Sequence, residues 1–184
     1  MKELSLNILD IAQNSVKAGA SLVDIFIEEK GDLMTVTVKD DGCGMTPEFL
    51  AAVTDPFTTT RTTRKVGLGL PLLKMEAEQT GGSFHIESVS DKIDKEHHGT
   101  TVSASFVKSS IDFIPLGDII GTLLVLVQGA DGFDYVFEHT TEKGSVGFST
   151  AEMREMLGGD VPLGTPEVIA WLRDYLKEGY ESLR

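Results

Sequence analysis

The chain has 184 residues, a formal net charge of −13 and 41% hydrophobic residues, which suits one medium globular domain or one domain with a small addition. The negative charge disfavours contact with nucleic acid or an anionic lipid surface, because their phosphate groups would be repelled. One cysteine excludes an internal disulfide framework. There is no signal-peptide pattern, and no apolar run reaches the ~20 residues that span a bilayer. We therefore expect a cytoplasmic protein without a membrane anchor.

The first elements are predicted to be a helix and a hairpin. Apolar residues at helical spacing predict a helix over residues 3–18, with Ser5 as an early cap and Gly19 at its end. On both sides of the Gly31-Asp32 turn, apolar and polar residues then alternate with a period of two. Both arms of the hairpin should therefore be strands with one buried face.

A loop separates the next two predicted helices. Thr46-Pro47 provides a cap and a first helical proline for a short helix. Residues 54–66 are rich in threonine and basic residues and have no periodicity, which predicts a mobile loop. The glycines of Gly67-Leu68-Gly69 open a second long helix that ends at Gly81-Gly82. Two strands follow, residues 84–89 and 100–107.

The pattern changes after residue 108. Asp118 is a candidate cap for a very apolar helix through Val127, which we expect to pack on the rest of the domain, with docking of a partner as the alternative. Residues 135–138 and 146–148 can pair as a hairpin, Ser149 with Glu152 has capping-box spacing, and Thr165-Pro166 opens a last amphipathic helix. We therefore predict two parts, residues 1–108 and a C-terminal extension of residues 109–184.

This order of elements predicts an α+β fold. Helices should form one layer on one face of a mixed, mainly antiparallel sheet, giving a two-layer sandwich with a small α+β extension at the C-terminus.

Three features are candidates for binding an adenine nucleotide. Asp40 follows a strand and precedes Gly42 and Gly44, so its carboxylate can accept a base amine while the glycines let the backbone approach. The 67–69 segment precedes a helix, whose free amides and positive end can hold phosphate oxygens. Asn14 is unusual inside a helix, because asparagine competes for backbone hydrogen bonds. Taken singly, each has a structural alternative: a plain turn, or a structural asparagine.

The joint order of these features resembles the ATPase domain of bacterial histidine kinases and their GHKL superfamily. The likeness covers residues 4–108 and extends to individual sequence motifs. DPFTTTR resembles the F box, VGLGLPLLK the G2 box, and TGGSFHIES with GTTVSASF the closing strands. The resemblance implies the Bergerat fold and binding of ATP with Mg²⁺.

The resemblance also implies roles for individual residues. Asn14 corresponds to the asparagine that holds magnesium, and Asp40 to the aspartate that binds adenine. Phe57 corresponds to the F-box phenylalanine, a hydrophobic latch for the loop, with packing on the sheet as the structural alternative. The other nucleotide-binding positions implied in this way are Gly42, Gly44, Thr58, Thr59, Thr60, Arg61, Gly67, Leu68, Gly69 and Thr101.

Two positions depart from the usual histidine-kinase pattern. Lys65 stands where a fuller G2 box has glycine, which should stiffen the loop and add a cation toward the triphosphate; the alternative is a solvated lysine. Asp10 lies one helical turn before Asn14 on the same face, where many histidine kinases have asparagine. A carboxylate there is typical of the hydrolytic and serine-kinase branches, in which it acts as a general base. Asp10 is therefore the candidate catalytic residue, with a solvated polar residue as the alternative.

A second likeness lies in the first helix. Residues 14–20, N-S-V-K-A-G-A, resemble the first motif of the mismatch-repair ATPases, which share a carboxylate at the position of Asp10. The loop and the second glycine motif of that branch differ from DPFTTTR and GLGL. We interpret this likeness as chemistry shared across the superfamily.

The destination of the phosphoryl group is not evident from the sequence. Only six residues precede Asn7, so we expect no phosphoacceptor helix before the domain, and the four histidines are expected to be structural or solvated. The leading hypothesis is a stand-alone, magnesium-dependent ATPase or kinase that transfers phosphate to an unidentified protein partner. The alternative is a non-enzymatic regulator, partly like anti-sigma factors, whose nucleotide changes its affinity for a partner.

Overall fold

The computed structural model describes residues 3–53, 69–159 and 161–183. Six strands form one sheet of order β3-β4-β2-β1-β5-β6. The strands are β1 (Leu22–Lys30), β2 (Leu33–Asp40), β3 (Ser83–Val89), β4 (Gly99–Val107), β5 (Asp134–Thr141) and β6 (Gly144–Ser149). The helices of the described part are α1 (Leu4–Lys17), α2 (Pro47–Val53), α3 (Gly69–Gln79), α4 (Ile119–Gln128), α5 (Thr150–Met156) and α6 (Pro166–Ser182).

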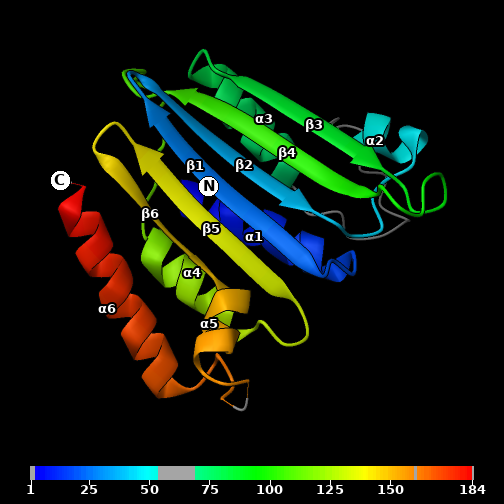
Figure 1. The fold of residues 1–184 in the computed structure, drawn as a ribbon. Coiled ribbons are helices and arrows are strands. Elements are labelled where there is room, and N and C mark those ends of the chain that lie inside the picture. Colours follow the sequence, from blue (N-terminus) through cyan, green and yellow to red (C-terminus); the bar gives the residue numbers. More distant parts are fainter. Residues whose placement is uncertain (1–2, 54–68, 160, 184) are drawn as a thin grey trace.

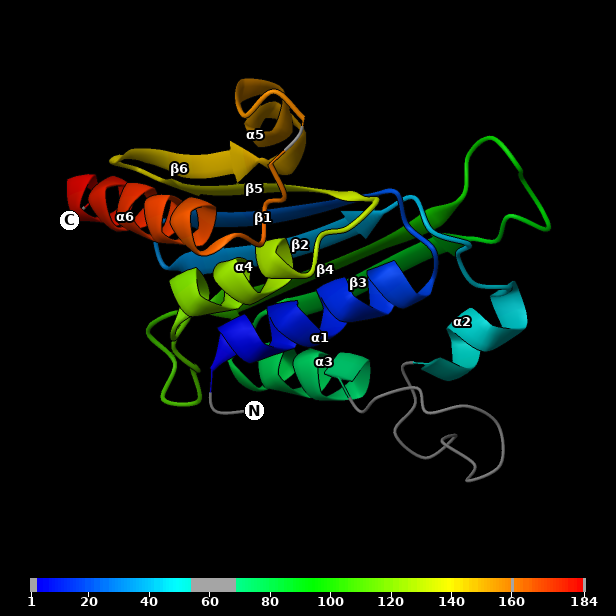
Figure 2. The same ribbon diagram turned by 90° about the horizontal axis from the view of Figure 1, so that it is seen from below.

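The sheet is mixed and mainly antiparallel. Only β1 and β5 pair in parallel, and every other neighbouring pair of the described sheet is antiparallel. Helices α1, α3 and α4 cover one face of the sheet, and α6 lies beside α4 and along β6 (Figure 1, Figure 2). The predicted α+β architecture is thereby confirmed. No helix in the described ranges is long and apolar enough to cross a bilayer.

Helix ends follow the predicted capping residues in part. Asp118 caps α4, since its Oδ1 accepts the Gly121 amide at 2.8 Å. At α1 the predicted cap Ser5 is wrong: Glu3 occupies the N-cap position without a side-chain cap, and the Ser5 hydroxyl, inside the first turn, donates to Glu3 Oε2. The helix ends before Gly19, whose φ of +77° suits glycine.

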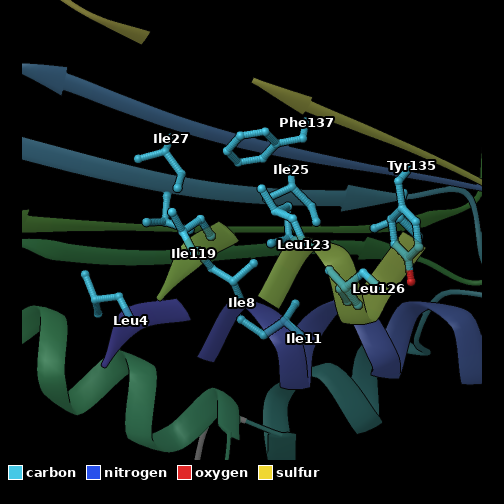
Figure 3. Close-up of a cluster of buried hydrophobic side chains, with 14 of the residues drawn as sticks. Leu4, Ile8, Ile11, Ile25, Ile27, Ile119, Leu123, Leu126, Tyr135 and Phe137 are labelled. Carbon is cyan, nitrogen blue, oxygen red and sulfur yellow. The ribbon is translucent and has the colours of Figure 1, made fainter. Parts of the chain in front are cut away.

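The core lies between the sheet and helices α1 and α4 (Figure 3). Its members come from alternate positions of the strands and from one face of each helix, as periods of two and 3.6 residues require. The side chains labelled in Figure 3 are Leu4, Ile8, Ile11, Ile25, Ile27, Ile119, Leu123, Leu126, Tyr135 and Phe137, all buried. The strongly apolar α4 therefore packs on the domain, as predicted.

Sheet and core both continue across residue 108. In the parallel pair, Ile25 of β1 lies opposite Phe137 of β5. The start of α1 is also tied to the later part of the chain, because the Leu4 amide donates to the Pro115 carbonyl at 3.0 Å. Residues on both sides of the predicted boundary at 108 thus contribute to one cluster of buried side chains.

Replacing Leu123 by alanine tests whether this core unfolds as one unit. Leu123 is 1% exposed, so we expect Leu123→Ala to lower the free energy of unfolding by about 2–5 kcal/mol through lost burial and a cavity. Urea unfolding followed by far-UV circular dichroism and by tryptophan fluorescence should shift as one transition. Val125→Ala, on the same helix but 52% exposed, is the control and should change stability by less than about 0.5 kcal/mol. Two separate transitions would contradict a shared core.

A chain of polar side chains joins β1, β5 and α6 at the hairpin end of the sheet. Lys108 Nζ donates to Glu29 Oε2 at 2.9 Å, and His139 Nε2 lies 3.1 Å from Glu29 Oε1. His139 Nδ1 lies 2.9 Å from the Tyr180 hydroxyl. A neutral imidazole satisfies both contacts if Nε2–H donates to Glu29 and Nδ1 accepts from Tyr180. The network therefore favours the uncharged form of His139.

Titration of His139 should make stability depend on pH. Burial lowers the pKa of His139 below its usual 6.5, an effect that the Glu29 charge only partly offsets. At pH values between the lowered pKa of folded His139 and the 6.5 of the unfolded chain, the unfolded chain binds more protons than the folded one. The free energy of unfolding therefore falls as pH falls. Burial alone would raise the pKa of Glu29, but the hydrogen bonds and charges of Lys108 and His139 lower it overall from 4.5. The contribution of Glu29 is thus lost only at lower pH.

We expect the free energy of unfolding to be smaller at pH 5.5 than at pH 7.5. Urea titrations at both values measure the difference. His139→Gln should lower stability at both pH values and reduce the difference between them. His85→Gln, at a side chain 68% exposed, is the control and should keep the full difference. The assignment to His139 is wrong if His139→Gln also keeps the full difference in stability between pH 5.5 and pH 7.5.

Candidate functional site

Asp40, the last residue of β2, has its carboxyl group held by three hydrogen bonds. Oδ1 accepts the backbone amides of Gly42 at 2.9 Å and Thr100 at 3.2 Å. Oδ2 accepts the Ser15 hydroxyl of α1 at 2.6 Å. Asp40 is half-buried, and each carboxylate oxygen has two acceptor sites. The carboxyl group is therefore fixed in place, yet Oδ2 keeps an acceptor site for a ligand.

The loop after β2 is tied down on both sides. The Cys43 amide donates to the Ala18 carbonyl at the end of α1, and the Cys43 carbonyl accepts the Asp91 amide, both at 2.9 Å. Gly44 has a φ of +64°, and a β-carbon there would lie 1.8 Å from the Val89 carbonyl oxygen. Only glycine fits this position. The predicted glycine thus lets the loop approach the end of β3.

The start of β4 completes the surroundings of Asp40. A β-carbon at Gly99 would lie 2.0 Å from the Asp40 carbonyl oxygen, so the two strands approach closely there. Thr100 is the register partner of Asp40 and shares its face of the sheet. Thr101 pairs with Lys39, and its side chain belongs to the opposite face. The structure thus brings Thr100, rather than the predicted Thr101, to Asp40.

Asp10 and Asn14 lie one turn apart on α1, and the first residue of α3 lies against Asp10. A β-carbon at Gly69 would be 1.9 Å from Asp10 Oδ2, so glycine permits this approach. Asp10 Oδ2 is buried and has no hydrogen-bond partner within the described ranges. The first amides of a helix lack intrahelical acceptors. A buried carboxylate oxygen of Asp10 therefore lies against the start of a helix.

Eight predicted site residues lie outside the residues that the structure describes. They are Phe57, Thr58, Thr59, Thr60, Arg61, Lys65, Gly67 and Leu68. Their roles in holding the nucleotide stay predictions.

Some residues around the site were not singled out from the sequence. Ser15 is one, although a serine on the buried face of α1 was a signal that it has a polar partner. Another is His98, whose Nδ1 lies 2.6 Å from the Gly42 carbonyl oxygen and must donate, since a carbonyl only accepts. The buried pair of Asn7 and Glu76 joins α1 to α3, with Asn7 Nδ2 donating at 2.6 Å. Neither contact has a periodic signal.

The described residues fit an adenine nucleotide with Mg²⁺. The free acceptor site of Asp40 suits an exocyclic amine, and the buried Asp10 Oδ2, which has no hydrogen-bond partner in the described part, is a second acceptor without a donor. No group of three or more His, Cys, Asp or Glu in the described part is placed to hold a metal ion. Nucleotide-bound Mg²⁺ needs only one or two protein oxygens besides phosphates and water, so a single side-chain oxygen, as predicted for Asn14, is enough.

Comparison with known proteins identifies the family. The family described as "Histidine kinase-, DNA gyrase B-, and HSP90-like ATPase" matches residues 2–110. The chain belongs to this family. The predicted resemblance is thereby confirmed, and residues 2–110 form a histidine-kinase-like ATP-binding domain of the GHKL type.

Curated relatives with this domain are bacterial kinases and sensors. Sporulation kinase A of Bacillus subtilis (strain 168) is 33% identical over 108 residues, which cover 59% of this chain and 16% of that protein. A putative NtrY-like sensor histidine kinase of Rickettsia typhi is 28% identical over 93 residues, covering 50% of this chain and 15% of that protein. The chain thus spans about a sixth of the length of the curated relatives it matches.

Two solved structures share the fold. The N-terminal domain of a DNA repair protein has a TM-score of 0.55 and 16% identity, covering 81% of this chain and 52% of that one. The ADP-bound MutL ATPase domain of Aquifex aeolicus has a TM-score of 0.51 and 14% identity, covering 86% of this chain and 70% of that one. The shared fold therefore covers more of the chain than the family's 2–110.

Proposed function

We propose that this protein is a magnesium-dependent ATPase or protein kinase that transfers the γ-phosphoryl group of ATP to water or to a separate protein partner. Family membership supports ATP binding. The observation that carries the enzymatic part is the buried Asp10 Oδ2, which lies without a partner against the first residue of α3. Most buried side-chain oxygens in proteins have a hydrogen-bond partner, so an oxygen without one supports a role toward a ligand.

Base recognition is assigned to Asp40. Its Oδ2 would accept the exocyclic amine of adenine, while Ser15, Gly42 and Thr100 hold the carboxyl group in one orientation. A base with a carbonyl in place of that amine, such as guanine, would place a hydrogen-bond acceptor against Asp40 Oδ2, which also only accepts. The site should therefore prefer ATP to GTP.

Phosphate handling is assigned to α1 and the start of α3. Bound Mg²⁺ would neutralise phosphate charge, and the side-chain oxygen of Asn14 would be its protein ligand. The backbone amides of Gly69 and Leu70, the first two residues of α3, would donate to phosphate oxygens, whereas Pro71 has no amide hydrogen to offer. The oxygen of a water or of a partner's hydroxyl would attack the γ-phosphorus while Asp10 takes its proton, and ADP would leave.

Binding and turnover measured on the full chain test this proposal. Calorimetric titration with ATP, ADP and GTP, each with and without Mg²⁺, should show saturable, magnesium-dependent binding of the two adenine nucleotides and much weaker binding of GTP. ATP carrying a labelled γ-phosphate should then release phosphate or label an added protein partner. Absence of ATP binding would refute the proposal as a whole. Binding without release or transfer would refute its enzymatic part and favour a nucleotide-gated regulator.

A further inference from the structure

Large apolar side chains are exposed on the surface formed by α5 and α6. Met156 is 73% exposed, Trp171 51% and Tyr175 43%. The rings of Trp171 and Tyr175 stack, with centroids 5.5 Å apart and planes 14° from parallel. Between the two helices lies a cavity of about 350 Å³ lined by Met153, Met156, Leu157, Glu167, Val168 and Trp171. We call this cavity and its rim the α5–α6 groove.

The groove continues along α6 toward β6. A second cavity of about 560 Å³ is bordered by Glu152 of α5, by the β6 strand and by Tyr175 and Glu178 of α6. The Tyr175 hydroxyl donates to the Gly147 carbonyl of β6 at 3.0 Å, so the stacked pair with Trp171 connects the two cavities. Figure 1 shows α6 running alongside β6, with α5 near the first turns of α6. From Glu167 to Glu178, α6 borders this surface over about 16 Å, or three helical turns.

Charges on α6 are sorted by face. Residues at spacings of four, seven, eight and eleven from Glu167 share one face of a helix. The residues on this face are Glu167, Trp171, Asp174, Tyr175 and Glu178. The two basic residues of α6, Arg173 and Lys177, fall outside it. The exposed face that borders the groove is therefore aromatic and acidic.

We propose that the α5–α6 groove binds a basic amphipathic helix of a partner protein. Apolar side chains of that helix would enter the cavity beside Trp171, and its lysines or arginines would face Glu167, Asp174 and Glu178. Exposed tryptophan and tyrosine are the side chains that most often dominate binding energy at interfaces. Exposed methionine adapts to varied apolar partners. An amphipathic helix in an apolar groove is a recurrent mode of peptide recognition.

Charge decides between this partner and other occupants. A second copy of the chain would place acidic rows against each other, because a two-fold contact pairs a surface with itself. An anionic membrane would be repelled by the same residues and by the net charge of −13. The lining of the two cavities includes neither Asp10 nor Asp40, and the proposal does not depend on nucleotide binding.

Trp171 provides a direct readout. It is the single tryptophan of the chain, so its emission should shift to shorter wavelength when a partner covers it. The probe is an 18-residue peptide of leucine and lysine with leucines at helical spacing, compared with a counterpart that has glutamate in place of lysine. We expect a saturable blue shift with the lysine peptide and none with the glutamate peptide. Equal binding of both peptides, or of neither, would overturn the proposal.

Variants separate the groove from general attraction to an acidic protein. With a dye-labelled lysine peptide, Trp171→Ala should weaken binding about 30-fold, the loss typical of an interface hot spot. Glu167→Lys with Asp174→Lys should weaken it at least about 10-fold at low salt. Glu28→Lys with Glu96→Lys, at exposed residues elsewhere, makes the same change in net charge and should alter binding less than about twofold. Circular dichroism checks the fold of each variant.

Two results would overturn this assignment. One is equal weakening by both charge-reversed pairs, which would mean that the peptide responds only to net charge. The other is a dimer in sedimentation whose Trp171 emission is already shifted without peptide, which would assign the groove to a second copy of the chain.

Discussion

Replacing Asp40 by asparagine is expected to weaken ATP binding at least about 100-fold while preserving the fold. Asparagine has the same shape, and its side-chain oxygen can keep the amides of Gly42 and Thr100 that Oδ1 now accepts. Its NH₂ group then replaces Oδ2, where the Ser15 hydroxyl can accept one hydrogen. The second N–H of the asparagine side chain would face the exocyclic amine of adenine, which is also a donor. Binding should therefore fail through a mismatch of donors and not through unfolding.

Competition with a fluorescent ATP analogue measures this loss. Ser15→Ala is the matched control, because it removes one hydrogen bond that orients Asp40 but keeps the acceptor itself. We expect that control to weaken ATP binding only about three- to tenfold. An unchanged ATP affinity in Asp40→Asn would show that the base is recognised elsewhere, even if the protein still hydrolyses ATP.

Replacing Asp10 by asparagine is expected to slow phosphate release or transfer about 10²- to 10⁴-fold, the usual contribution of a general base. ATP affinity should stay within about threefold of the parent protein. An amide cannot take a proton from water or a hydroxyl at neutral pH. It also costs less to bury without a partner than a carboxylate does, so the free energy of unfolding should stay equal or rise.

Steady-state phosphate release, calorimetric ATP titration and urea unfolding test these three expectations together. Glu78→Gln is the control, since it makes the same chemical change at an exposed residue of α3 and should leave all three quantities unchanged. Full turnover by Asp10→Asn would exclude Asp10 as the base. Loss of both turnover and ATP binding would instead indicate that Asp10 helps to hold the nucleotide.

Local sequence patterns sufficed to predict much of the fold and the position of Asp40. The alternating arms around Gly31 and the helical stripe of α1 are short-range signals that tertiary packing preserved. Gly44 was recognisable because a D-x-G-x-G loop demands backbone conformations that only glycine adopts easily. The resemblance to histidine-kinase-like ATPases then related these positions to nucleotide binding, and the match to residues 2–110 confirms the family.

Contacts between distant segments were beyond such patterns. The choice of Thr100 over Thr101 depends on strand register, and a shift of one residue places a side chain on the other face. The bond from Ser15 to Asp40 joins two elements that have separate periodicities. The misplaced cap at Ser5 has a related cause: hydrogen bonds from Leu4 and Ser5 to the chain before α4 fix where α1 begins.

The parallel pairing of β1 with β5 has a consequence for folding. Residues 1–110 contain β1 to β4 but neither β5 nor α4. Without β5 the outer side of β1 would present unpaired amides and carbonyls, and without α4 the side of α1 that contacts it would be uncovered. Open strand edges template association between chains, and late long-range pairing prolongs that exposure. A fragment ending at residue 110 should therefore aggregate, which light scattering would reveal, whereas the whole chain closes this edge with its own β5.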